Sequence, residues 1–252
     1  MRAAVVLTCA LALAACGTIF AVARAVILRP LPFAEPDSLV WVWATRLDRD
    51  RAFFSLPDFL EQRHDTAALA DLAAISNWGA NLEGGGEPRR LQGIRATANL
   101  LSLLGVAPAA GRALRLDDDG AAAPAVAMLS YGVWREQFGA SPSAIGRVVR
   151  LNDAPCEIVG VLPRGFLIPG SDTDVLAPLR PDTDPRRTDY DTNFIRVIGR
   201  LREGVGWGTL GRQMAATTAR LRTAYPGPNA GSPFGASSGN FTKLPKPLLV
   251  WL

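Results

Sequence analysis

The feature that most constrains this 252-residue chain is an apolar run at its N-terminus. No charged side chain occurs from Ala3 to Ala23, and after Arg24 the run continues to Leu28. About 20 apolar residues in a helix, each rising about 1.5 Å, match the roughly 30 Å hydrocarbon core of a bilayer. The run therefore predicts a transmembrane helix over residues 1–30, with the lipid bilayer as its partner.

Other interpretations of this run change how the rest of the chain would be attached to the membrane. Arg2 followed by an apolar core is typical of a secretory signal, although the apolar region is long for one. Leu13-Ala-Ala-Cys16-Gly17 has the form of a lipoprotein cleavage box, and lipidation of Cys16 would give an acyl-anchored periplasmic binding module. A buried helix is the remaining possibility. Apolar residues continue to Leu28, beyond that box, which favours the spanning helix.

Composition excludes several classes of function. The net charge is +4, but the arginines are scattered among acidic residues without a basic stripe, so we expect a solvated surface and no nucleic-acid partner. Two of the three cysteines, Cys9 and Cys16, lie in the apolar run. The rest of the chain has only Cys156 and therefore cannot form a disulfide within itself. With one histidine, His64, the chain has no Cys/His zinc cluster.

Catalysis is not predicted. A serine triad would depend on His64, which lies at the end of a predicted helix, where a dipole partner is the simpler interpretation. A thiol protease would need an exposed Cys156 paired with His64, whereas the alternation of its strand predicts a packed thiol. We therefore assign no catalytic, cofactor-binding or metal-binding residue and expect no cofactor.

Motifs that could suggest a ligand have simpler interpretations. Asp117-Asp-Asp-Gly120 lacks the alternate spacing and later glutamate of a calcium loop, which favours an acidic turn. The glycines of Glu83–Pro88 lack the following helix and Lys-Ser/Thr of a phosphate loop, so they predict a hairpin turn. Carboxylate pairs in Pro- and Gly-flanked segments predict solvated loops; they are Asp172/Asp174, Asp182/Asp184 and Asp189/Asp191.

Hydrophobic periodicity and cap signals predict an α+β fold after the apolar run. Strands are expected over residues 39–44, 72–82, 89–97, 125–129, 145–151, 155–162, 175–179 and 194–201. Helices are expected after the cap Ser55, over 99–105, after the cap Ser130 and from Trp207 to Tyr225. The aromatic stripe Tyr131, Trp134 and Phe138 predicts core packing. The composition of residues 227–252 predicts a disordered or truncated tail.

Several of these segments together resemble the MacB/FtsX-type ABC transporter permeases, in particular the MacB-like periplasmic core domain proteins. The likeness extends in order over about 200 residues. Its motifs are Ile19–Val22, Val26–Phe33, Pro36–Leu39, Phe54–Phe59, Leu104–Arg112, Leu129–Trp134, Ile145–Arg147, Ile158–Pro163, Gly165–Phe166, Gly199–Val205 and Tyr225–Pro226.

This resemblance implies a single-pass protein of the bacterial inner membrane with a cytoplasmic N-terminus and a mixed α/β periplasmic domain. We expect the domain over residues 35–226, with a β-rich insertion at about 140–180. The implied role is non-catalytic and belongs to the efflux or mechanotransmission class. A separate ABC ATPase drives conformational changes in a permease dimer, and the helix transmits these changes to the periplasmic domain. Relatives continue into three more transmembrane helices, so the sequence is expected to be a fragment lacking the transport-coupling helices.

Overall fold

The computed structural model describes residues 33–46, 49–65, 68–84, 87–168, 170–224 and 240–243 of the chain. The predicted transmembrane helix over residues 1–30 and Cys16 lie outside this part. Among the described residues, no helix has both the length and the apolar character needed to cross a membrane. The predicted helix is therefore not tested by the structure.

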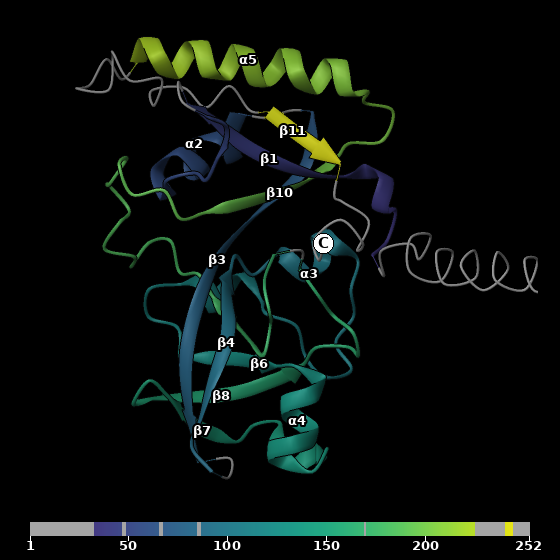
Figure 1. The fold of residues 1–252 in the computed structure, drawn as a ribbon, viewed down its shortest axis with the longest axis vertical. Coiled ribbons are helices and arrows are strands. Elements are labelled where there is room, and N and C mark those ends of the chain that lie inside the picture. Colours follow the sequence, from purple (N-terminus) through teal and green to yellow (C-terminus); the bar gives the residue numbers. More distant parts are fainter. Residues whose placement is uncertain are drawn as a thin grey trace, which may run out of the picture.

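The described residues form one large mixed sheet with four helices packed around it (Figure 1). The helices are α2 (Leu56–Asp65), α3 (Leu100–Leu104), α4 (Tyr131–Phe138) and α5 (Trp207–Ala224). The strands are β1 (Leu39–Arg46), β2 (Arg49–Ala52), β3 (Leu69–Glu83), β4 (Arg89–Ala96), β5 (Ala110–Gly111), β6 (Val126–Leu129), β7 (Val148–Leu151), β8 (Ala154–Val161), β9 (Val175–Pro178), β10 (Arg196–Leu201) and β11 (Asn240–Lys243).

The strand order is β11-β1-β10-β3-β4-β9-β6-β8-β5, with β2 paired to β1 and β7 paired to both β3 and β8. Most pairs are antiparallel, while β4 with β9 and β6 with β8 are parallel. Because β7 joins β8 back to β3, strands β3, β4, β9, β6, β8 and β7 form a closed ring. A closed ring leaves fewer unpaired strand edges than an open sheet.

The 15-residue β3 links the two ends of the molecule (Figure 1). Its first half pairs with β10 in a first lobe, formed with β1, β2, β11, α2 and α5. Its last residues pair with β7 in a second lobe, formed with β6, β8, β9 and α4. The two lobes therefore share a strand and are not joined by a linker.

Alternation along β3 divides its buried residues between the two faces of the sheet. Leu72 and Ala74 enter a first-lobe core, and Ala80 and Leu82 enter a second-lobe core on the same face. Ala73 and Ile75 point to the opposite face and enter a shared core. The first-lobe core includes Val40, Phe54, Phe59, Val197 and Leu210; the second-lobe core includes Leu91, Leu129, Val149, Ile158 and Val175; the shared core includes Trp41, Ile94, Leu104, Met128 and Ile198.

Local signals in the sequence account for most element boundaries. Ser55 accepts a hydrogen bond from the Asp58 amide at 3.3 Å, and Ser130 accepts one from Val133 at 3.1 Å, so both predicted caps are confirmed. Gly105 and Gly139 end α3 and α4 with φ of 66° and 60°. The mixed α/β fold is confirmed. The strand predicted from residue 145 begins at Val148, because residues 142–144 form a 3-10 turn.

Candidate functional site at the N-terminal edge of the domain

The leading segment, Phe33–Ser38, brings the chain into the domain. Phe33 is buried in the shared core and packs edge-to-face on Phe166, with ring centroids 6.5 Å apart. Glu35 has a φ of 44°, and Pro36–Ser38 form a 3-10 turn that leads directly into β1. The segment is therefore packed into the domain from its first described residue.

Arg200, on β10, holds this segment in place. Its Nε donates to the carbonyl of Leu103 at 2.8 Å, its Nη1 to Oγ of Ser38 at 2.6 Å, and its Nη2 to the carbonyl of Ala34 at 2.7 Å. The side chain is only 17% exposed, and the Glu35 carboxylate lies 3.7 Å from Nη1. One planar guanidinium thus joins three segments of the chain, which its five fixed donors make possible.

The end of α3 completes the contact. The Ala34 amide donates to the carbonyl of Leu104 at 3.0 Å. Gly105 has a φ of +66°, and a Cβ built on it would lie 2.3 Å from the Cβ of Ala34. Only glycine meets both conditions, the left-handed backbone and the close approach. We call the set of Ala34, Ser38, Leu103, Gly105 and Arg200 the Arg200 clasp.

These residues lie far apart in the sequence, and no local pattern predicted that they would meet. Three residues of the clasp lie in motifs that carry the family resemblance: Ser38 in Pro36–Leu39, Gly105 in Leu104–Arg112 and Arg200 in Gly199–Val205. The presence of these residues in the motifs was the available signal, but their separation in the sequence hid their proximity. Chemically, the clasp positions backbone: its one hydroxyl, Oγ of Ser38, accepts from Arg200 and donates to the carbonyl of Glu35 at 2.9 Å.

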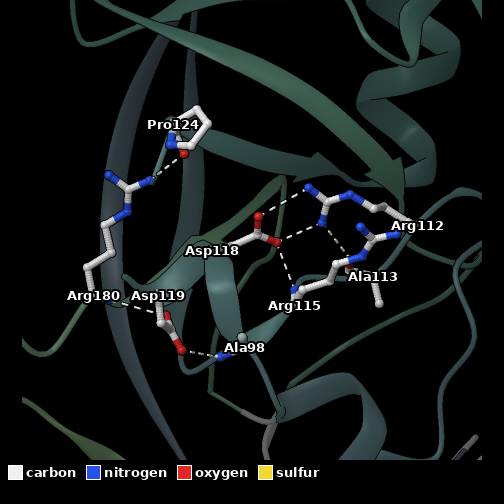
Figure 2. Close-up of polar contacts among 8 residues, drawn as sticks. All are labelled: Ala98, Arg112, Ala113, Arg115, Asp118, Asp119, Pro124 and Arg180. Carbon is white, nitrogen blue, oxygen red and sulfur yellow. Dashed lines mark hydrogen bonds and ion pairs between the residues drawn. The ribbon is translucent and has the colours of Figure 1, made fainter. Parts of the chain in front are cut away.

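The acidic turn Asp117–Asp119 is confirmed as a turn, and the structure gives its last two carboxylates structural roles. Figure 2 shows Asp118 accepting from Arg112 Nη1 at 2.7 Å, Arg112 Nη2 at 3.1 Å and the Arg115 amide at 2.7 Å. Asp119 accepts from the Ala98 amide at 2.8 Å and the Arg180 amide at 3.3 Å. These oxygens therefore already have partners from the protein.

The two carboxyls have opposite pKa shifts. Burial raises the pKa of Asp118, but the hydrogen bonds from Arg112 and Arg115 outweigh it, so the net pKa lies below the ordinary value. Burial raises the pKa of Asp119, and the amides of Ala98 and Arg180 offset this only in part. Two adjacent carboxyls thus differ because only one of them is paired with a guanidinium.

Cys156 and the aromatic stripe are the next residues to place. The Cys156 thiol is 5% exposed in the second-lobe core, and burial raises its pKa to about 11, so the predicted packed thiol is confirmed. The side chain of His64 lies outside the described residues. Trp134 and Phe138 pack against the second-lobe core as predicted, while Tyr131 stacks on Arg164, whose guanidinium carbon is 4.3 Å from the ring centroid.

One carboxylate of each predicted pair is held by a backbone amide or by an arginine. Asp174 accepts from the Gln92 amide at 3.0 Å, Asp184 is paired with Arg186 at 2.7 Å, and Asp189 accepts from the Asp191 and Thr192 amides. Within the described part of the chain, no group of three or more His, Cys, Asp or Glu side chains is placed to hold a metal ion.

The fold is that of a mixed α/β domain whose first described residues are held by the Arg200 clasp. Solved structures with this fold include a domain of a protein assigned as a permease from Porphyromonas gingivalis, with TM-score 0.58, 18% identity, and coverage of 75% of this chain and 86% of that one. The extracellular domain of the noncanonic ABC-type transporter YknZ from Gram-positive bacteria has TM-score 0.54 and 14% identity, covering 81% and 99%. The periplasmic region of MacB from Actinobacillus actinomycetemcomitans has TM-score 0.56 and 13% identity, covering 82% and 88%.

The sequence itself matches the MacB-like periplasmic core domain over residues 3–217. The chain therefore belongs to this family, and the resemblance predicted from its motifs is confirmed. No curated protein matches the chain.

Proposed function

We propose that this chain is the non-enzymatic periplasmic part of an ABC-transporter-type permease, anchored in the bacterial inner membrane by one helix over residues 1–30. The observation that carries the proposal is the family match, which extends over residues 3–217 and so includes the apolar run as well as the folded domain. We propose a separate ABC ATPase and a second permease copy as partners.

The extents of the parts belong to the same proposal. The periplasmic domain occupies residues 35–226, with a β-rich insertion at about 140–180, and residues 227–252 follow it. Asn240–Lys243 of this last stretch form β11 beside β1, a strand that the composition did not predict.

The Arg200 clasp gives the domain a stiff connection to whatever precedes it. Ala34 is hydrogen-bonded to both α3 and Arg200, and Phe33 is packed in the shared core. A displacement applied at Phe33 and Ala34 would therefore be transmitted to β10 and α3. Such a connection suits a mechanical role in a transporter.

Membrane fractionation of the full chain tests the anchor. We expect the chain to sediment with the inner membrane, to resist carbonate extraction and to retain Met1 in mass spectrometry of its N-terminus. Cys16→Ala should behave like the wild type, because the anchor is the helix itself. An acylated Cys16 with loss of the preceding residues would instead support the lipoprotein-type binding module, and a soluble wild-type chain would count against both.

Hydrogen exchange of the full chain in detergent tests the clasp. Arg200→Gln removes the guanidinium group and leaves the carbonyls of Ala34 and Leu103 without their donor. The amides of residues 34–39 and 103–106 should therefore exchange at least ten-fold faster. Arg202→Gln is the matched control, because this exposed arginine makes a single long bond, 3.4 Å, to the Leu69 carbonyl. Equal exchange in the two variants would show that Arg200 does not hold the segment.

A further inference from the structure

A cavity of about 200 Å³ lies between the two lobes, on the face of β3 and β4 that carries the first-lobe and second-lobe cores. Its walls come from both sides. Leu179 belongs to the first-lobe core, while Leu151 and Cys156 belong to the second-lobe core. Trp78 and Arg95 contribute from β3 and β4 between them. The cavity therefore lies between the first-lobe core and the second-lobe core.

Arg95 is the polar group that distinguishes this cavity. In the sheet, the backbone of Arg95 lies opposite Ser76 of β3 and Ala177 of β9. Its guanidinium carbon lies 4.7 Å from the ring centroid of Trp78. Its side chain makes no hydrogen bond or ion pair with any residue that the structure describes. All five guanidinium donors are thus available, on a planar group already oriented by stacking on an indole.

Asp184, the carboxylate whose charge acts on Arg95, is already paired with another arginine. Asp184 is 4% exposed and is held by Arg186, whose Nε and Nη2 donate to its two oxygens at 2.8 and 2.7 Å. Arg180 lines the same cavity. Burial lowers the pKa of Arg95; Asp184 opposes this, whereas the charges of Arg186 and Arg180 act in the same direction as burial. The cavity consequently carries an excess of positive charge beside apolar walls.

We propose that this cavity binds a small organic monocarboxylate with a flat apolar body. The guanidinium of Arg95 would take the carboxylate in a bidentate pair, the geometry that an arginine fork favours. Trp78, Val126 and Leu151 would pack against the apolar body. The volume limits the ligand to a small one, since pockets for drug-sized molecules are about 300–1,000 Å³.

Such a ligand would contact both lobes at once. Binding would therefore favour the arrangement of lobes seen in the structure and raise the unfolding temperature by mass action. This inference does not depend on the proposed transporter role, because it concerns only the cavity and its lining residues.

Calorimetric titration with benzoate tests the proposal, using the full chain in a neutral detergent and empty micelles as the blank. Benzoate should bind and raise the unfolding temperature, whereas benzamide, which has the same shape without the charge, should bind at least ten-fold more weakly. Absence of benzoate binding, or equal binding of the two compounds, would overturn the proposal without any variant.

Substitutions at two positions of β4, Arg95 and Arg90, locate the site. Arg95→Gln should weaken benzoate binding at least ten-fold, and Arg95→Lys should weaken it less, because the charge remains but the fork is lost. Arg90→Gln is the matched control: it has the same change in charge on β4, but Arg90 pairs with Asn81, which lies on the opposite face of the sheet. If Arg90→Gln reduced binding as much as Arg95→Gln, the ligand would be responding to net charge and the proposed site would be wrong.

Discussion

At the scale of single residues, the polar core around Asp118 shows how an acidic turn is used internally. Asp118 is buried at 7% exposure and receives two bonds from Arg112 and one from the Arg115 amide (Figure 2). Replacing one partner of a buried charge-assisted pair leaves the other unsatisfied, which costs more than the bond itself contributes. Asp118 therefore fixes the path of the chain between β5 and β6.

We predict that Asp118→Asn lowers the free energy of unfolding by about 2 kcal/mol at pH 7. Because the folded-state pKa of Asp118 is lowered, its contribution is present above the ordinary carboxyl value of 3.8 and is lost as the pH falls through the folded pKa. The difference between wild type and variant should shrink accordingly in denaturant titrations at decreasing pH.

The control for this prediction is Asp117→Asn, since Asp117 is exposed in the same turn and should change stability little. The raised pKa of Asp119 acts in the opposite sense with pH, but Asp119 is present in both proteins. A difference between Asp118→Asn and wild type that stays constant down to pH 3 would contradict the assigned role.

The sequence predicted the turn at Asp117–Asp119 but not the use of its carboxylates. Consecutive aspartates before glycine are a local signal, whereas the Arg180 amide that binds Asp119 lies 61 residues away. The same limit applies to the Arg200 clasp, where the bond to Ala34 joins residues 166 positions apart. Local spacing carries no information on such partners, so they appear only once the strand order is known.

At the scale of elements, the close approach of β8 to the chain around β5 depends on a glycine. A Cβ built on Gly160 would lie 2.2 Å from the carbonyl oxygen of Arg112 and 3.1 Å from Cε of Met128. The Arg112 amide bonds the carbonyl of Val159 at 2.8 Å, which fixes the distance between the two backbones. Any side chain at position 160 must therefore separate them.

We predict that Gly160→Ala destabilises the fold by about 2–3 kcal/mol, through overpacking and loss of the β5 pairing. Gly132→Ala is the control, because a Cβ there meets only Oγ of Ser130 at 3.8 Å and lies in α4. It should be neutral or stabilising by up to about 1 kcal/mol. Equal denaturation midpoints for Gly160→Ala and wild type would show that β5 can move away at little cost.

Element types were predictable where the signal is local, and element pairing was not. The Asn152-Asp153 turn is confirmed, with φ of 50° and 64° as a tight hairpin requires. The side chain of Asn152 also accepts from the Asn81 amide at 2.8 Å, which fastens this hairpin to β3 and closes the ring of strands. Neither that contact nor the insertion of β10 between β1 and β3 follows from periodicity, because each depends on residues far apart in the sequence.

At the scale of the whole molecule, the two lobes share β3, and the shared core continues behind both. Ile75 and Ile198 of the first lobe lie in the same apolar cluster as Met128 and Leu176 of the second. Exposing one lobe would therefore remove part of the apolar contacts of the other, at roughly 25 cal/mol per Å² of surface exposed. The two lobes are therefore coupled through their packing and a shared strand.

We predict that the two lobes unfold as one cooperative unit. In native-state hydrogen exchange of the full chain in detergent, the slowest amides of β8 and of β10 should show the same free energy of opening and the same dependence on denaturant. The physical reason is the continuous pairing from β10 through β3 and β4 to β9, which no unpaired segment interrupts. Gly160→Ala, although it lies in the second lobe, should lower the protection of both strands by the same amount. Faster exchange confined to β8 would show that the second lobe opens alone and that β3 acts as a hinge.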